Sequence, residues 1–290
     1  MKISSMRFAI RVLFVTFTAA FFVAALLHAQ MGEGGSRQQS TPVGTSTDRQ
    51  QTELHELTDV QRQPGVRVDP KEQKAYDTFF RTEDSDKKIQ LGTAFLDKYP
   101  TSIFAEAVDA GLANAYYDKQ DWKDFYATAD KALALKPDDV DVLTSVGWVI
   151  PHAYDPHDDD AAEQLNKAET CEKHAIDVLA KMPKPAGLTD AQFAASKADK
   201  AIQAHSALGL VYFRRNDFGN SVTELRMATD NRPNPDQTDL FVLGTDLQNL
   251  DRFTEAADVF GHCGQIAGGL QDRCKESADL AKRQAAQPKR

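Results

Sequence analysis

The chain has 290 residues, 41% of them hydrophobic, and a formal net charge of −9. This composition can build a sizeable core, which excludes a wholly disordered chain. Because binding to phosphate backbones depends on clustered Lys and Arg, the acidic balance argues against nucleic acid as the main partner.

An export signal is predicted at the N-terminus. Lys2, Arg7 and Arg11 precede an apolar run of 16 residues, Val12 to Leu27, which only threonines interrupt. Cleavage after Ala29 would leave a chain of net charge −12, because residues 1–29 carry three positive charges and no acid. The run is shorter than the roughly 20 apolar residues that span a bilayer, but an uncleaved membrane anchor stays open as the alternative.

Residues 30–68 are predicted to form a disordered tether. They are rich in Gly, Ser, Thr, Gln and Pro, and no apolar period runs through them. After Asp69 the sequence changes to long helical periods rich in Ala, Leu, Lys and Asp. An all-α domain is therefore expected over residues 69–284.

One spacing recurs within this helical region. Leu112 and Tyr116 are four residues apart, Trp122 follows six residues later, and Pro137 follows after 15 more. A second segment has the same intervals and a third has most of them; their residues are Leu208, Tyr212, Phe218 and Pro233, and then Leu243, Leu247 and Phe253. A chance pair of amphipathic helices would not repeat these intervals, so the spacing predicts a repeat architecture.

These segments resemble tetratricopeptide repeats, a helix-turn-helix unit with a Leu-Gly pair, a Tyr, small residues in its second helix and a closing Pro. Leu208-Gly209 and Leu243-Gly244 supply the pair in two segments. The resemblance implies an all-α, right-handed helical-hairpin solenoid of about five units with a capping helix. The expected units are 69–102, which is degenerate, 106–139, 140–183, which carries an insertion of about nine residues, 189–235 and 237–270, and the cap is 271–284.

Two local patterns refine this expectation. Thr189 and Gln192 form a capping box that starts the first helix of the fourth unit early. Cys263 and Cys274 stand five residues on either side of the Gly268-Gly269 pair, which predicts a turn between antiparallel helices. The two cysteines would face each other, either as a disulfide or as small core residues. Cys171 is expected to be a buried thiol.

The resemblance implies a concave groove lined by the first helix of each unit. Carried onto this sequence, the groove holds aromatic and amide side chains, which suit an extended peptide or a partner helix. Some of them would alternatively pack against neighbouring helices. The basic clamp that some members use for a terminal carboxylate is missing, since Ala110 stands in its first place. The expected groove residues are Asn114, Tyr117, Trp148, His152, Gln203, Phe213, Arg214, Phe241, Gln248 and Asn249.

A cluster of His and Asp residues lies between His152 and Asp160. Imidazole and carboxylate together can bind zinc, and carboxylates can bind calcium. The spacing matches no ligand template, and the prolines and acids also describe an ordinary solvated loop before a helix, which is the favoured interpretation. The weak metal-ligand candidates are His152, His157, Asp155 and Asp158.

No phosphate loop, nucleophile elbow, zinc-protease helix or dinucleotide fingerprint is found in the sequence. We therefore expect no cofactor and no enzymatic activity. The expected function is an extracytoplasmic scaffold that binds a protein or peptide. The phrase KYPTS at 98–102, together with the export signal, is similar to repeat proteins of bacterial envelope assembly. The alternatives are a metal-dependent or hydrolytic enzyme that uses loop 152–160, and a structural protein that self-associates through a solenoid end.

Overall fold

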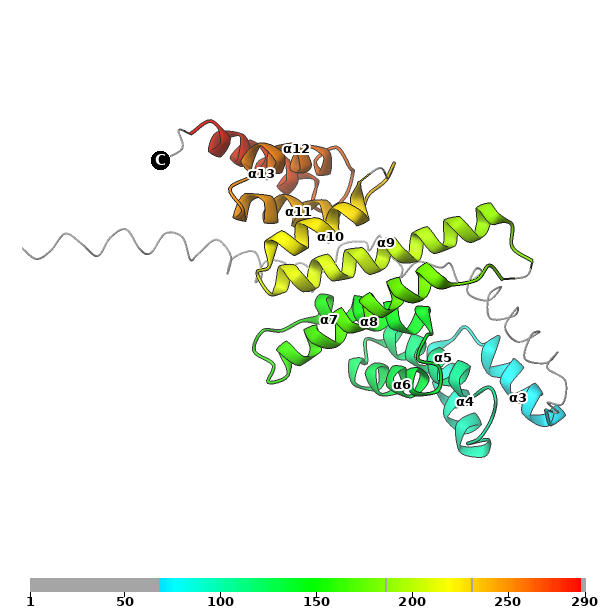
Figure 1. The fold of residues 1–290 in the computed structure, drawn as a ribbon. Coiled ribbons are helices and arrows are strands. Elements are labelled where there is room, and N and C mark those ends of the chain that lie inside the picture. The colour runs from blue at the N-terminus through cyan, green and yellow to red at the C-terminus, as the bar shows by residue number, and fades with distance from the viewer. Residues whose placement is uncertain (1–67, 186, 231, 288–290) are drawn as a thin grey trace, which may run out of the picture. The chain divides into compact units, whose positions relative to one another are not determined.

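The computed structural model describes residues 68–185, 187–230 and 232–287, and all regular structure in these ranges is helical (Figure 1). The all-α prediction is confirmed. The predicted signal at 1–29 and the tether up to residue 67 lie outside the described residues. The described helices are α3 (Pro70–Phe80), α4 (Ser85–Lys98), α5 (Ala105–Lys119), α6 (Trp122–Leu135), α7 (Val140–Ala153), α8 (Ala161–Lys181), α9 (Asp190–Arg214), α10 (Phe218–Thr229), α11 (Gln237–Asn249), α12 (Phe253–Cys263) and α13 (Gln271–Ala285).

Neighbouring helices pack in succession. Each helix contacts the next along the chain from α3 to α13, and α9 also contacts both α7 and α11. In Figure 1 the two longest helices, α8 and α9, lie side by side. Two helices fall within each of the five expected unit ranges, to within one residue. Contacts between neighbours in sequence therefore dominate the packing.

The core follows the same serial order. A first cluster of mostly aromatic side chains lies among α3, α4 and α5, and a second is shared by α5 to α9. A third cluster joins α9 to α13 and includes both Cys263 and Cys274. Each cluster is therefore shared by a few consecutive helices, and α7, in which only Ala153 is exposed, is the most deeply enclosed of them.

Three of the hairpins share one turn geometry. The residue with positive φ is Gln120 (58°), Asn216 (59°) or Asp251 (56°), and each stands eight residues after the leucine of the recurring spacing. The amide of the following residue donates a hydrogen bond to the carbonyl of the residue four after that leucine, at 3.0, 2.9 and 2.8 Å respectively. Asn and Asp tolerate this left-handed conformation better than most residues. The interval in the sequence therefore corresponds to one turn used three times.

Two glycines of the recurring spacing allow close approach of the paired helices. A Cβ added to Gly209 would lie 2.5 Å from Cγ of Leu225, and one added to Gly244 would lie 2.6 Å from Cε1 of Phe260. In both hairpins the contacted side chain stands 16 residues after the glycine. The Leu-Gly pair therefore marks the place where the second helix packs against the backbone of the first.

The α7–α8 hairpin differs from the others in its connection. Helix α7 continues through Pro151 to Ala153, so that His152 belongs to the helix and the loop spans only residues 154–160. Pro151 lacks a backbone N–H, but its place in the last turn limits the loss to one hydrogen bond. The expected insertion is thus divided between an acidic loop and a longer second helix, since α8 contains 21 residues where α10 contains 12.

Both local predictions at helix ends are confirmed. The side chain of Thr189 accepts a hydrogen bond from the amide of Gln192, and the side chain of Gln192 accepts one from the amide of Thr189, as a capping box requires. Cys263 and Cys274 form a disulfide between α12 and α13, with their Cα atoms 5.6 Å apart. Among the described helices, none combines the length and the apolar character needed to cross a bilayer.

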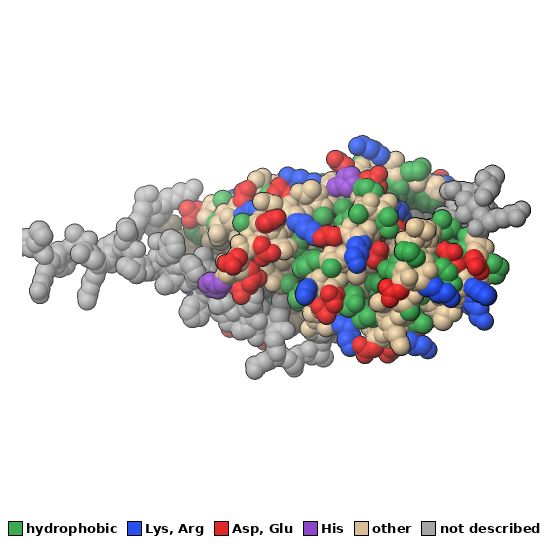
Figure 2. Space-filling view, turned by 90° about the horizontal axis from the view of Figure 1, so that it is seen from below, with side chains coloured by type: hydrophobic (Ala, Val, Ile, Leu, Met, Phe, Trp, Pro, Cys, Tyr) green, Lys and Arg blue, Asp and Glu red, His purple; other side chains and the backbone are tan. Residues whose placement is uncertain are grey.

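Acidic and basic side chains are interspersed among hydrophobic ones on the face of the molecule that Figure 2 shows. No broad field of a single sign develops there. A basic stripe of the kind that tracks a phosphate backbone is therefore not found on this face.

Candidate partner-binding site

The structure brings three of the expected groove residues together where α7 and α9 meet. Trp148 and His152 lie one turn apart on α7, with their ring centroids 3.9 Å apart. Nδ1 of His152 lies 2.6 Å from the carbonyl oxygen of Trp148. Because a carbonyl can only accept, Nδ1 carries the proton, and Nε2 of a neutral ring is left as an acceptor. The Trp148 indole is half-buried and keeps part of its surface exposed.

His152 is held in its neutral form. Burial, assisted by the positive charge of Arg214, lowers the pKa of His152 to about 4, although the carbonyl of Trp148 and the carboxylate of Asp236 oppose this shift. At neutral pH the ring is therefore an uncharged group that can accept a hydrogen bond at Nε2.

Arg214 supplies the positive charge of the cluster. Its Nε donates to the carbonyl oxygen of Pro151 at 3.0 Å, and its guanidinium lies 5.7 Å from the centroid of the Tyr154 ring. Burial lowers the pKa of Arg214. No carboxylate is among the contacts that the described part of the chain makes with this guanidinium. A partner carbonyl or carboxylate could therefore use its remaining N–H donors.

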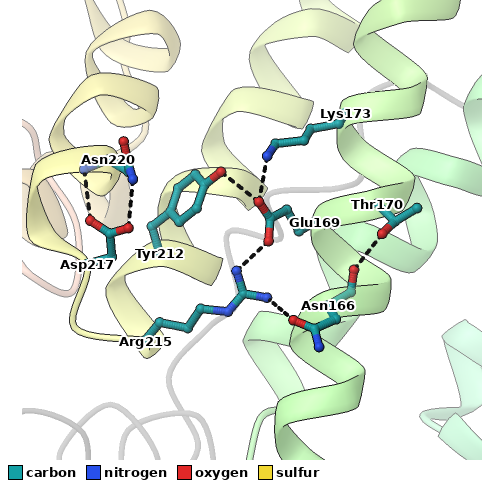
Figure 3. Close-up of polar contacts among 8 residues, drawn as sticks. All are labelled: Asn166, Glu169, Thr170, Lys173, Tyr212, Arg215, Asp217 and Asn220. Atoms are coloured by element: carbon teal, nitrogen blue, oxygen red, sulfur yellow. Dashed lines mark hydrogen bonds and ion pairs between the residues drawn. The ribbon is translucent and has the colours of Figure 1, made fainter.

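A polar network holds the end of α9 against α8 (Figure 3). The hydroxyl of Tyr212 donates to the carboxylate of Glu169 at 2.9 Å, and Lys173 donates to the same carboxylate at 2.6 Å. The guanidinium of Arg215 donates to both Glu169 and the side-chain oxygen of Asn166. Burial opposes ionisation of this acid, but the hydrogen bonds from Arg215, Lys173 and Tyr212 lower the pKa of Glu169 to about 2. The network fixes the last turn of α9, and with it the backbone of the neighbouring Arg214.

The other groove residues of α5 and α9 contact their own helical neighbours. Tyr117 is half-buried, with its ring 5.9 Å from the Trp122 ring, and Asn114 is half-buried one turn earlier. Gln203 is buried, and Phe213 packs against the α9–α13 core. Asn114 and Tyr117 lie on α5, whereas Gln203 and Phe213 lie on α9.

The groove residues of α11 are largely covered. Phe241 is 5% exposed, because Phe260 lies on one side of its ring at 5.6 Å and the guanidinium of Arg273 at 5.2 Å. Gln248 donates to Gln284 at 2.8 Å. The terminal helix α13 thus reaches this side of α11, and of the three expected residues only Asn249 is exposed. Phe241 retains little surface for a partner.

The four weak metal candidates are not gathered into one site. His152 lies on α7 and is stacked on Trp148, while the exposed His157 donates its backbone amide to the Asp155 carboxylate at 2.9 Å. Asp158 is exposed at the end of the loop. In the described ranges no three His, Cys, Asp or Glu side chains are placed to hold a metal ion.

Two residues of the cluster were not expected from the sequence. Tyr154, the first residue of the loop after α7, contacts Arg214. Asp236 caps α11, accepting from the amide of Thr238 at 2.7 Å, and its charge acts on His152. The sequence indicates the helix cap, because Asp236 directly precedes an apolar helical period. Nothing in the sequence indicates that Asp236 lies near His152, which stands 84 positions earlier.

Several buried ionisable side chains lie outside this cluster, among them Glu172, Asp239, Asp246 and Cys171. Burial raises the pKa of Glu172 well above its ordinary value and that of Asp239 to about 7, with the neighbouring Asp236 adding to the second shift. Burial likewise raises the pKa of Asp246 to about 8 and that of Cys171 to about 12. The Cys171 thiol therefore stays protonated at neutral pH, which makes it a poor nucleophile.

The contacts of Ser221 indicate that the carboxyl group of Asp246 is protonated and donates its proton to Ser221. Oγ of Ser221 lies 2.5 Å from Oδ2 of Asp246 and 2.8 Å from the carbonyl oxygen of Gly209. A hydroxyl has one hydrogen, so both contacts are hydrogen bonds only if a protonated Asp246 donates to Ser221 and Ser221 donates to Gly209. This chain of donors joins α9, α10 and α11.

Comparison with known proteins adds no assignment. No protein-family model matches the sequence, and no curated protein matches it significantly.

Proposed function

We propose that the chain is a tetratricopeptide-like scaffold that binds a protein or peptide segment at the α7–α9 cluster, and that it acts by binding and without catalysis. The observation that supports this most directly is the grouping of a half-exposed indole, a neutral imidazole acceptor and a guanidinium without a described carboxylate partner. Trp, Tyr and Arg are the side chains that dominate the energetics of protein interfaces.

The cluster suits main-chain recognition. Nε2 of His152 can accept from a peptide N–H, and Arg214 can donate to a carbonyl or carboxylate. The Trp148 and Tyr154 rings offer apolar area between these polar groups. A segment that lies along α7 and α9 would therefore meet an acceptor, a donor and two aromatic surfaces within one site.

The repeat interpretation is supported by local geometry. The same left-handed turn follows the same leucine at the same interval in three hairpins, and glycine contacts recur at the same offset in two of them. A stack of such units would present one helix of each pair along a common surface. The covered Phe241 restricts the proposed binding surface to the part around α7 and α9.

The location that we propose is the bacterial cell envelope, reached through the N-terminal signal, with residues 30–68 as a tether. The apolar run after three basic residues supports export. The disulfide between Cys263 and Cys274 fits an oxidising compartment, where such bonds persist.

Site-specific cross-linking tests the binding site. The photoreactive residue p-benzoylphenylalanine is placed at Trp148 or, as the control, at Met227, an exposed side chain on α10. Irradiation in an envelope extract should yield a discrete adduct from position 148 and not from position 227. Equal adducts from both positions would contradict the proposed site.

The affinity of site variants for the captured partner then tests whether Trp148 and Arg214 bind it. We expect Trp148→Ala and Arg214→Ala each to weaken binding by about tenfold or more, since interface Trp and Arg truncations commonly cost upwards of about 1.4 kcal/mol. Arg81→Ala, which removes an exposed arginine at the end of α3, serves as the matched control. Unchanged affinity in both site variants would overturn the proposal.

A further inference from the structure

A second groove lies between α3 and α4, away from the α7–α9 cluster. Its walls are residues 71, 74, 75 and 78 of α3 and residues 91, 94, 95 and 98 of α4, and its volume is about 370 Å³. On both helices these positions follow the i, i+3, i+4, i+7 pattern, which places them on one face. Each wall therefore runs for about 10 Å, or two helical turns.

The floor of this groove is apolar. Ala75 and Leu91 are half-buried, Ala94 is exposed, and Phe95, at 3% exposed, forms the base that continues into the aromatic core. At one end Tyr99 leads into an adjoining hollow of about 300 Å³, which Ile103 also lines, 46% exposed. Apolar surface is thus left open within the groove, at Ala75, Leu91 and Ala94, and at Ile103 beyond its Tyr99 end.

The rim of the groove is basic in a chain whose net charge is −9. Lys71, Lys74 and Lys98 all line it. Lys98 lies 5.1 Å from the Tyr99 ring, and no described carboxylate forms an ion pair with these three ammonium groups. Glu72, an acid on α3 that lines the adjoining hollow, accepts a hydrogen bond from Ser102 at 2.6 Å. The charge of the rim is therefore available to an incoming group.

We infer that this groove docks an acidic amphipathic helix of a partner protein. Apolar side chains spaced i, i+3, i+4 and i+7 on that helix would enter between α3 and α4, and its flanking carboxylates would meet the three lysines. Charge complementarity would set the orientation and speed the encounter. The assignment rests on the α3–α4 face alone and would stand if the α7–α9 proposal failed.

The shape of the surface favours a helix over an anionic bilayer. Binding to a membrane interface needs apolar side chains that protrude into the headgroup region. Here the apolar residues form the floor of a concavity while the lysines form its edges. A single helix fits between two helices, because such packing brings helix axes within about 8 to 10 Å.

The test uses the full chain and a defined probe. The probe is a fluorescein-labelled 14-residue peptide with Leu at positions i, i+3, i+4 and i+7 and Glu at the remaining exposed positions; a second peptide replaces each Glu by Lys. Fluorescence anisotropy should show saturable binding of the acidic peptide, weakened by salt, and at least about tenfold weaker binding of the basic one. Equal binding of both peptides, or none of the acidic one, would overturn the inference.

Two variants separate charge from shape. The double variant Lys71→Glu with Lys74→Glu should weaken binding of the acidic peptide at least about tenfold. The control, Lys123→Glu with Lys181→Glu at exposed lysines elsewhere, changes the net charge equally and should leave the affinity unchanged. Ala94→Arg adds a positive charge but fills the groove, so it should weaken binding. Tighter binding to Ala94→Arg would show that charge alone attracts the peptide and would contradict the groove.

A vesicle arm distinguishes the other class of partner. Vesicles of phosphatidylcholine with 30% phosphatidylglycerol should not bind the full chain through this face, so Lys71→Glu with Lys74→Glu should leave any vesicle association unchanged. Vesicle binding that the same pair abolishes, with no binding of the acidic peptide, would assign the face to a lipid surface and overturn the inference.

Discussion

Glu172 lies with its carboxyl group against the backbone of Gly147, so close that a Cβ added to the glycine would stand 2.2 Å from Oε1. Leu225 and Phe260 take the corresponding place against glycines in two other hairpins. The offset is 25 residues here and 16 there, and the difference of nine arises from the longer α7–α8 loop together with an additional turn at the start of α8. Glu172 is 0% exposed and neither oxygen has a hydrogen-bond partner among the described residues. An acid therefore occupies a core position.

Replacing this acid with an apolar residue should stabilise the fold. For Glu172→Leu we expect the free energy of unfolding at pH 7 to rise by about 2 kcal/mol, because the penalty of burying an unpaired polar group is removed. Urea unfolding measures it. Glu163→Leu, on the exposed surface of the same helix, should change stability by less than about 0.5 kcal/mol. A loss of stability in Glu172→Leu would show that the carboxyl makes a favourable contact.

The glycine contacts predict opposite effects of the same substitution at two positions. Gly209→Ala should destabilise the protein by about 1 to 3 kcal/mol, because its Cβ would meet Leu225 at 2.5 Å. Gly219→Ala, on α10 with no atom within 4 Å of the added Cβ, should stabilise it by about 0.5 to 1 kcal/mol. Thermal unfolding of both variants checks the pair. Similar shifts in the two melting temperatures would contradict the tight contact at Gly209.

Buried carboxyl groups predict that the protein becomes more stable as the pH falls from 8 to about 5. The pKa values of Asp246 and Asp239 are raised from 3.8 to about 8 and about 7. The folded state binds these protons more tightly than the unfolded state. Their contribution to the free energy of unfolding is therefore fully present below about pH 4, the pKa of the unfolded chain, and is lost as the pH rises through the folded values of about 7 and 8. Melting temperatures between pH 5 and 9 measure the slope.

A conservative amide isolates the contribution of Asp246. Asp246→Asn keeps a donor for Ser221 and cannot ionise, so it should reduce the dependence of the melting temperature on pH above 6. Asp258→Asn removes an exposed acid from α12 and should leave the slope as it is in the parent. If Asp246→Asn keeps the full slope, Asp246 is not the group that titrates.

The C-terminal disulfide predicts both a thiol count and a stability difference. Denatured protein should titrate one thiol, from Cys171, and three after reduction. Cys263→Ser with Cys274→Ser should lower the free energy of unfolding by about 3 kcal/mol, the loop-entropy value for a separation of 11 residues. Reduction of the parent should have the same effect. Three thiols before reduction would contradict the pairing.

Local patterns in the sequence predicted the elements that local contacts determine. The recurring intervals matched three hairpin turns, and the Thr189–Gln192 pattern predicted the start of α9. The symmetry of the two cysteines about Gly268-Gly269 predicted that they face each other, and of the two alternatives left open the structure has the disulfide. In each case the partners lie within one helix end or one hairpin, so spacing alone specifies them.

Contacts between distant segments could not be predicted in the same way. Arg214 reaches Pro151, 63 residues earlier, and the ring of Phe241 is covered by Arg273 from a helix that was expected only as a cap. Groove positions that are carried over from a repeat pattern assume that each unit packs between two units of regular length. The longer α7–α8 loop, the longer α8 and the position of α13 change those neighbours, which concentrates the candidate site on α7 and α9.

Gln237 has a consequence for the order in which the C-terminal end is assembled. Its side chain donates to the carbonyl of Ile266 at 2.9 Å and accepts from the amide of Leu270 at 3.2 Å, so the first residue of α11 shapes the loop that brings Cys263 to Cys274. In a nascent chain this loop would reach its final conformation only after α11 has docked. Oxidation of the cysteine pair then records that α11 has docked against this loop and that the C-terminal end is complete.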